Sequence, residues 1–188
     1  MAYPAKIDRK RILAAALRLL ARRGLGGMSL RAVATSLKIA PNALYRYFAD
    51  HAHLEAAVGA EVSRMLYSDL LKAKRPDDAA RSIRDLAVAY LKFARRHALL
   101  YEALLIPRPA SGAEAVAPEQ LWLFVVEQVG RLTGKARAPD AALALWGFLH
   151  GTAALQSAGR LGAGKRASGI EFGLSAWLAA AGPPGVAR

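Results

Sequence analysis

Four polar side chains stand close together in the sequence, at Asn42, Tyr45, Arg46 and Tyr47. The amide of Asn42 presents a donor and an acceptor side by side, which fits the edge of adenine, and Arg46 could read guanine or hold a phosphate. The hydroxyls of Tyr45 and Tyr47 suit phosphate contacts, although each tyrosine could instead pack on a neighbouring helix. Together these side chains indicate recognition of nucleic acid.

Two short helices would position these side chains. Residues 29–37 are predicted to be helical, because Ser29 can accept a hydrogen bond from a free first-turn N–H and apolar residues follow at helical spacing. These apolar residues are Leu30, Val33, Ala34 and Leu37. Pro41 suits the first position of a second helix, in which Leu44 and Phe48 form an apolar stripe. Two short helices joined by a tight turn predict a helix-turn-helix, whose second helix can enter the major groove of DNA.

The residues from Ser29 to Phe48 read Ser-Leu-Arg-x-Val-Ala-x-x-Leu and then Ile-Ala-x-x-x-Leu-Tyr-Arg-Tyr-Phe. This pattern resembles the DNA-binding domain of tetracycline-repressor-type (TetR family) regulators, and the resemblance extends over residues 8–58. It implies DNA contacts from a defined set of positions. The set is Ser29, Arg31, Lys38, Pro41, Asn42, Ala43, Tyr45, Arg46, Tyr47 and His51.

Two positions depart from the family pattern. The turn between the two helices usually holds glycine, and here it holds Lys38, which would cost about 1 kcal/mol in a left-handed conformation. The next helix usually opens with a lysine that contacts a phosphate, and His51 stands there instead. Because a histidine is charged only when protonated, that contact would depend on pH.

The net charge of +13 is concentrated near the N-terminus. Residues 1–48 hold ten Lys and Arg residues and a single acid, Asp8. This distribution indicates a polyanionic partner, although a basic face can also serve solubility alone. The chain has no cysteine, which excludes disulfides and thiolate metal sites and agrees with the cytoplasmic location that we expect.

The whole chain reads as helices separated by turns that contain glycine or proline. The expected helices are 8–23, 29–37, 41–48, 50–74, 78–97, 97–106, 118–133, 139–161 and 168–181. We therefore predict an all-α fold of about nine helices, with a three-helix DNA-binding domain in residues 1–49 and a helical ligand-binding and dimerisation domain in residues 50–182. Residues 107–117 are expected to form a loop and residues 183–188 a disordered tail.

Residues 141–159 carry no formal charge and are long enough to span a bilayer. We reject a transmembrane helix, because the run contains His150, Gln156 and several glycines and no second segment is comparable. A helix that is apolar on all sides is more often buried on both sides. In the TetR family the corresponding helix lines the ligand cavity with one face and packs on a second subunit with the other. Trp146, His150 and Gly151 also resemble a C-terminal subclass of that family.

Two further sets of candidate residues lie in the C-terminal part. The dimer interface is expected at Gly147, Gly151, Ala154, Ala158, Ile170, Leu174, Trp177 and Leu178. A small, largely apolar ligand is expected among Tyr67, Tyr90, Phe93, Tyr101, Trp122, Phe124, Phe148, His150 and Gln156. Each aromatic residue in this second set could instead belong to the hydrophobic core.

The histidines do not form a catalytic or metal-binding pattern. His51 and His53 are two residues apart and cannot share a helix face. The sequence contains no metalloprotease, serine-hydrolase or phosphate-loop motif. His150 could be paired with Glu127 or Glu102 as acid and base, but a buried histidine satisfied by one neighbour is the simpler interpretation. We therefore expect no catalytic residues, no metal and no cofactor.

The sequence thus predicts a ligand-responsive transcriptional regulator. We expect a repressor that binds a palindromic DNA operator as a homodimer and is released by its ligand. One alternative is a protein that binds membrane surfaces through residues 8–23, although this segment lacks the aromatic residues that interfacial helices usually carry. The other alternative is an enzyme that has kept a regulator's scaffold.

Overall fold

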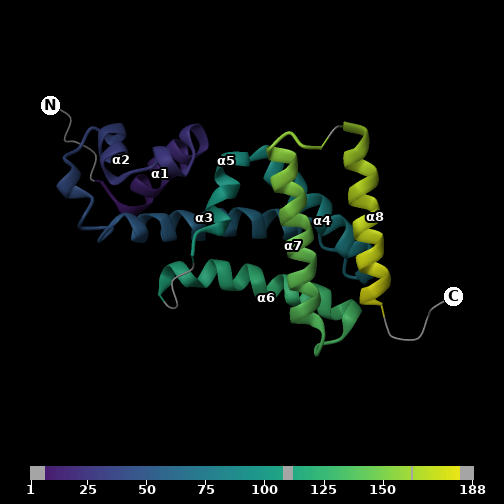
Figure 1. Ribbon diagram of the computed structural model, residues 1–188. Coiled ribbons are helices and arrows are strands. Elements are labelled where there is room, and N and C mark those ends of the chain that lie inside the picture. Colours follow the sequence, from purple (N-terminus) through teal and green to yellow (C-terminus); the bar gives the residue numbers. More distant parts are fainter. Residues whose placement is uncertain (1–6, 108–111, 162, 183–188) are drawn as a thin grey trace. The chain divides into compact units, whose positions relative to one another are not determined.

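The computed structural model describes residues 7–107, 112–161 and 163–182, without the side chains of 163–167. The described residues form helices and turns and no strand, so the all-α prediction is confirmed (Figure 1). The α-helices are α1 (Arg9–Arg23), α2 (Leu30–Leu37), α3 (His51–Ala73), α4 (Ala79–Arg96), α5 (Ala98–Tyr101), α6 (Ala113–Thr133), α7 (Ala138–Ser157) and α8 (Ala163–Ala181). The short 3-10 helices are η1 (Leu25–Gly27), η2 (Pro41–Ala43) and η3 (Glu102–Leu105). The predicted tail at 183–188 lies outside the described residues.

Local hydrogen bonds explain where several helices begin. In four of them a side-chain oxygen at the N-cap accepts a hydrogen bond from the backbone N–H three residues later, over 2.7 to 3.1 Å. The capping residues are Asp8, Ser29, Asp50 and Asp78. Each bond satisfies one of the first-turn N–H groups that have no partner inside the helix.

The chain divides into two compact units. The first unit contains the chain up to Arg64 together with residues 97–118, and the second contains residues 65–96 and the chain from Glu119 onward. Helices α3 and α6 each run from one unit into the other. The first unit therefore includes the start of α3 and the segment around α5, which the predicted domain of residues 1–49 did not contain.

The first unit packs α1, α2, η2 and the start of α3 around one apolar core. Its fully buried side chains include Ile12, Leu20, Met28, Val33, Leu44, Phe48 and Leu54. Helix α3 also lies close to η3 at Gly59, where an added Cβ would stand 3.1 Å from the carbonyl oxygen of Ala103. Glycine at this position therefore permits the close approach of the two segments.

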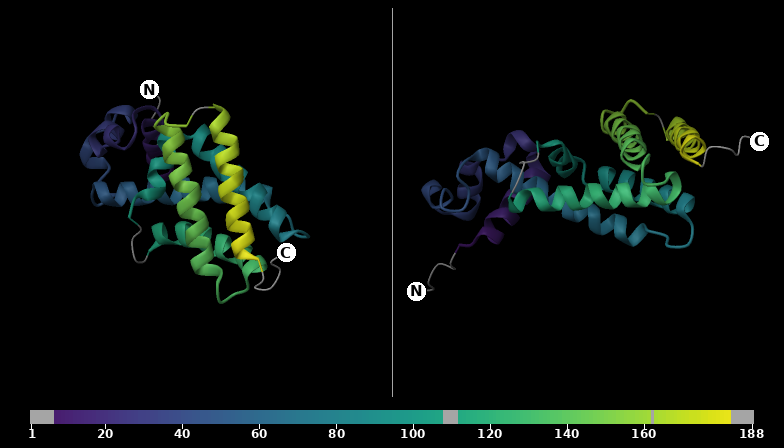
Figure 2. Two further views of the ribbon diagram at one scale, coloured as in Figure 1. Left: turned by 45° about the vertical axis from the view of Figure 1, so that its right-hand side comes forward. Right: turned by 90° about the horizontal axis from the view of Figure 1, so that it is seen from below.

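In the second unit α7 and α8 lie side by side (Figure 2). The indole N–H of Trp177 on α8 donates to the carbonyl oxygen of Ala141 on α7, over 3.1 Å. Phe148 of α7 occupies the space above Gly173 of α8, where a Cβ would fall 2.3 Å from the phenyl ring. Among the described residues, no helix is long and apolar enough to cross a membrane.

Several predicted helices differ in type or extent. The helix expected over 97–106 is α5 followed by the 3-10 helix η3, and α7 ends at Ser157 rather than at 161. The segment expected as a helix over 41–48 is a 3-10 turn followed by further turns, with N–H groups bonded three residues back, as from Leu44 to Pro41. Helix α6 begins at Ala113, so Pro118 lies inside it rather than at its start. The alanine-rich turn before Pro118 is a strong helix former, which explains the earlier start. Helix α8 likewise begins at Ala163 rather than at 168.

Lys38 forms the turn between α2 and η2 with φ 55° and ψ 44°, as the sequence predicts. It is the one non-glycine residue with positive φ in the described ranges. We expect Lys38→Gly to raise the free energy of unfolding by about 1 kcal/mol, because glycine adopts this conformation without a Cβ clash. Urea denaturation measures the change. The control, Lys38→Ala, keeps the strained Cβ, and equal stability of the two variants would contradict the prediction.

Candidate functional site

Residues 41–48, which we call the reading segment, are held by two apolar side chains. Leu44 and Phe48 are both 0% exposed. The N–H groups of Tyr47 and Phe48 donate to the carbonyl oxygen of Leu44, over 2.8 and 3.0 Å. These contacts close the segment into a compact turn with its apolar side against the core.

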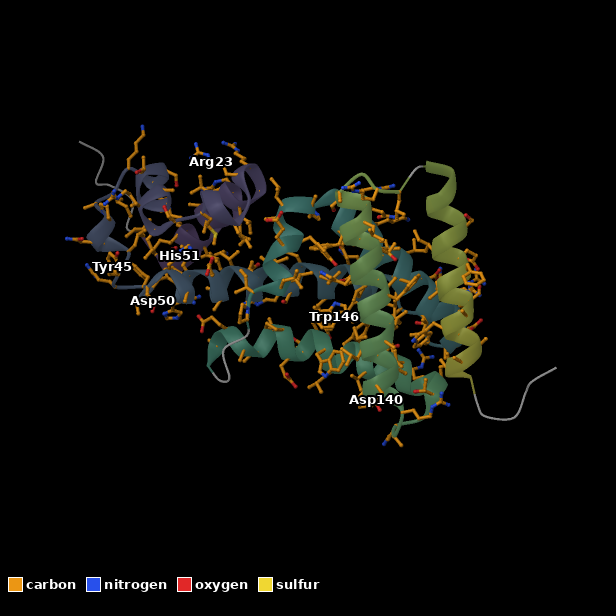
Figure 3. The ribbon with its side chains drawn as sticks, viewed as in Figure 1. Arg23, Tyr45, Asp50, His51, Asp140 and Trp146 are labelled. Carbon is orange, nitrogen blue, oxygen red and sulfur yellow. The ribbon has the colours of Figure 1, made fainter. Side chains whose placement is uncertain are left out.

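The other side of the reading segment faces outward. Asn42, Tyr45 and Arg46 are exposed, and Tyr45 projects from the surface (Figure 3). Pro41 is exposed at the start of the segment, and Ala43 is half-buried between its neighbours. An amide, a phenol and a guanidinium thus share one surface, which is a set of groups suited to base edges and phosphates.

The first turn of α2 has the features of an anion site. Ser29 uses its hydroxyl oxygen to accept from the N–H of Ala32 over 3.1 Å, while Arg31 is exposed one residue into the helix. Remaining first-turn N–H groups and the helix dipole favour a negative group here. Lys38 is exposed at the other end of α2.

Tyr47 is used inside the first unit. Its hydroxyl donates to the carbonyl oxygen of Ile7 over 2.7 Å, and the side chain is half-buried. Phosphate oxygens accept hydrogen bonds, so a phosphate contact by Tyr47 would require this bond to break. Of the two readings of Tyr47 that the sequence left open, packing on a neighbouring element agrees better with this geometry.

His51 opens α3 and is exposed. Its Nε2 lies 3.2 Å from Oε1 of Glu55, one turn along the helix. Because His51 is exposed, a phosphate group could reach its side chain. The phosphate contact itself stays a prediction.

A hydrogen-bonded aromatic cluster joins α4 and α7 in the second unit. The indole N–H of Trp146 donates to the hydroxyl of Tyr90 over 3.1 Å, and that hydroxyl lies 3.4 Å from Nδ1 of His150. Since Tyr90 accepts from the indole, its own proton can go to His150. Burial lowers the pKa of His150, so the imidazole is neutral at neutral pH and can accept at Nδ1.

Some of the predicted ligand residues come together around this cluster. The ring centroids of Trp122 and Trp146 are 6.4 Å apart, and those of Trp146 and His150 are 6.2 Å apart. Tyr67 and Phe124 form a separate edge-to-face pair at 5.3 Å. Trp146 is missing from the predicted ligand set, although its spacing of four residues from His150 already placed the two on one helix face.

Other predicted ligand residues lie elsewhere. Phe148 points toward Gly173 on α8, since it fills the space above that glycine. Tyr101 is buried on α5, which belongs to the first compact unit. Phe93 is buried on α4, and Gln156 is half-buried near the end of α7. In the described parts of the chain, no three metal-ligating side chains gather in one place.

Some of the predicted dimer residues lie in the core of the chain itself and others lie on its surface. Leu174 is 3% exposed, and the indole of Trp177 is hydrogen-bonded to α7, so both side chains already pack within the chain. Exposed positions along α7 are Gly147, Gly151, Ala154 and Ala158, while Ile170 and Leu178 on α8 are half-buried. Besides Trp146, which is also exposed, three further exposed apolar side chains on the same two helices are absent from the predicted interface. These are Leu143, Leu155 and Phe172.

Comparisons with known proteins agree with this geometry. Residues 12–58 match the family described as "Bacterial regulatory proteins, tetR family", and residues 83–172 match "Tetracyclin repressor-like, C-terminal domain". No curated protein matches the chain. The helix-turn-helix and the outward polar side chains define a DNA-binding protein. More specifically, the chain belongs to the TetR family of transcriptional regulators.

Solved structures share the fold. A protein of unknown function from Rhodococcus sp. RHA1 is 22% identical with a TM-score of 0.78, over 97% of this chain and 100% of that one. A variant of TetR from Acinetobacter baumannii AYE, solved in complex with minocycline, is 20% identical with a TM-score of 0.72, over 93% and 96% of the two chains. A possible TetR family regulator from Streptomyces coelicolor A3(2) is 21% identical with a TM-score of 0.69, over 92% and 98%.

Asn42 and Arg31 should have separable effects on DNA binding. Asn42→Ala should remove preference at one base pair, worth about 1–3 kcal/mol, because an amide reads a base edge. Arg31→Ala should weaken binding to all sequences and reduce the salt slope by about one, because it would release one phosphate contact. Fluorescence anisotropy on matched and mismatched duplexes measures both. If Asn42→Ala weakened every duplex equally, its assignment as a base reader would be wrong.

Proposed function

We propose that this regulator is a repressor that binds a palindromic operator as a homodimer and is released by a small, largely apolar ligand in the cytoplasm. The observation that carries the proposal is the exposed surface of Asn42, Tyr45 and Arg46, held outward by the buried Leu44 and Phe48. Amide and guanidinium groups on a rigid turn can make the bidentate contacts that discriminate base pairs.

An apolar face on α7 and α8 supports a dimer. Leu143 and Leu155 on α7 are 56% and 49% exposed, and Phe172 on α8 is 78% exposed. Between the two leucines, a Cβ added at Gly147 or Gly151 would meet nothing within 4 Å. Small residues let a second helix approach closely, and exposed apolar side chains on the same helices supply the burial that drives association. A two-fold axis would pair this face with its own copy.

The operator proposal is tested by selecting duplexes from a random pool. We expect an inverted repeat whose half-sites lie about 34–36 Å apart, because the two DNA-binding domains of the dimer must enter successive major grooves. Leu143→Glu should give monomers in sedimentation and lose binding to this repeat, since the charge enters a two-fold interface twice. Selection of no sequence, together with pelleting on anionic liposomes, would favour the membrane-surface alternative.

The matched control for this variant is Leu123→Glu on α6. Leu123 and Leu143 are both 56% exposed, so the two variants remove the same side chain and add the same charge. We expect the Leu123→Glu protein to remain a dimer and to bind the selected repeat. A Leu143→Glu protein that still sedimented as a dimer would place the interface on another face.

A ligand site around Trp122, Trp146, Tyr90 and His150 is supported by their chemistry. The cluster joins apolar rings to a hydroxyl and a neutral imidazole, which would let a largely apolar ligand find one or two polar contacts. The relative solved with minocycline also supports a small-molecule ligand for this fold. An effector acts on DNA binding only through its different affinity for the two conformations of the protein.

Ligand and operator should weaken each other's binding by the same factor, which is typically about 5- to 150-fold. A compound from a ligand screen is titrated by calorimetry with and without saturating operator. Equal affinities in the two titrations would disprove the release mechanism and leave DNA binding intact. Trp122→Ala should abolish the response without changing operator affinity; loss of folding would instead assign Trp122 to the core.

A further inference from the structure

Glu114, in the first turn of α6, joins residues from two other helices of the first unit. Its Oε1 accepts a hydrogen bond from Nη2 of Arg9 at the start of α1 and lies 3.5 Å from Nε2 of His53 in the first turn of α3. The Glu114 side chain is 13% exposed, whereas those of its two partners are more than 40% exposed. One carboxylate, shielded from solvent, thus links the beginnings of three helices.

Both partners of Glu114 also contact Phe48, the last residue of the reading segment. The guanidinium carbon of Arg9 lies 4.9 Å from the centroid of the Phe48 ring, and the His53 ring meets the same ring edge-on at 5.7 Å. A cation over an aromatic face and an edge-to-face ring pair are both attractive. Arg9 and His53 therefore each contact both the Phe48 ring and the carboxylate of Glu114.

Two local hydrogen bonds fix the turn in which Nε2 of His53 lies 3.5 Å from Oε1 of Glu114. Its Nδ1 accepts from the N–H of Ala49 over 3.4 Å, so the ring proton of the neutral form is on Nε2. The N–H of His53 donates to Asp50, which fixes the backbone of the same turn. Through His53, these contacts join Ala49, directly after the reading segment, to Glu114 on α6.

We propose that Glu114 is a positioning residue for DNA recognition, which holds Arg9 and His53 against Phe48 and so fixes the orientation of the reading segment. This inference rests on the proposed DNA-binding function. Glu114 itself contacts no DNA: its effect on the exposed Asn42 and Arg46 passes through Phe48. If the contacts of Glu114 with Arg9 and His53 favour the orientation of the reading segment that binds DNA, then DNA binding must stabilise those contacts by the same free energy.

The first test compares Glu114→Gln with Glu61→Gln. Glu61 pairs with Arg64 on α3, so the control makes the same charge change in a pair within one helix. We expect Glu114→Gln to weaken binding to the selected operator by about three- to tenfold with an unchanged salt slope, and the control to have no effect. Unchanged affinity would overturn the proposal. So would tighter binding with a steeper slope, because Glu114 would then merely neutralise Arg9.

A double-mutant cycle with Arg9→Gln shows whether the two residues act through each other. We expect the double variant to bind no more weakly than the weaker single variant, because both changes break one contact. Additive losses would mean that Glu114 acts by another route. If the wild-type protein selected no DNA sequence at all, the proposed function itself would fail, which is a distinct result from normal binding by Glu114→Gln.

Hydrogen exchange supplies a readout whose first measurement uses the wild-type protein alone. In the wild-type protein, operator binding should slow exchange of the α6 amides immediately after Glu114, although they belong to no DNA-contacting element. In Glu114→Gln that protection should disappear while protection of α2 remains. Wild-type exchange that is the same with and without operator would overturn the proposal, because a contact with a purely structural role does not respond to DNA.

Discussion

The burial of Leu44 and Phe48 is the constraint on which the proposed recognition of DNA by the reading segment depends. The reading segment contains only a 3-10 turn and the turns that follow it, so it lacks the continuous ladder of hydrogen bonds that makes an α-helix rigid. Its geometry must therefore come from packing. Both anchors are completely excluded from solvent, and shifting either would move Asn42 and Arg46 relative to any DNA they contact. If Asn42 and Arg46 read bases as we propose, their specificity depends on an apolar interaction that touches no base.

Features set by short-range chemistry could be predicted from the sequence. The N-cap at Ser29 and the left-handed turn at Lys38 each depend on residues within four positions, and the structure has both. Partners far apart in the chain could not be predicted. The bond from Tyr47 to Ile7 spans 40 positions and that from Arg9 to Glu114 spans 105. No local pattern encodes such pairs, because they arise when the elements pack.

The C-terminal part shows why residue type alone did not identify a site. Helix α7 has almost no charge, so its sequence does not reveal which face points where. Trp146 and His150 share a face, as their spacing of four residues requires, and meet Tyr90. Phe148 lies between them in sequence but points to Gly173 on α8. The aromatic residues of the predicted ligand set are all buried or half-buried, but assigning each to a ligand or to the core required the neighbouring helices.

Connectivity determines how a change in the second unit can reach the reading segment. The chain passes between the units three times, and two of these passages lie inside α3 and α6. A continuous α-helix transmits displacement well, because each residue is bonded four positions along. From Trp122 to Glu114 the axial rise is about 12 Å, or roughly two turns. Pro118 lies within that stretch and removes one backbone hydrogen bond, so α6 is less stiff there than α3. If a ligand binds beside Trp122 as we propose, its effect along α6 would pass through this weakened stretch, whereas the sequence of α3 contains no proline.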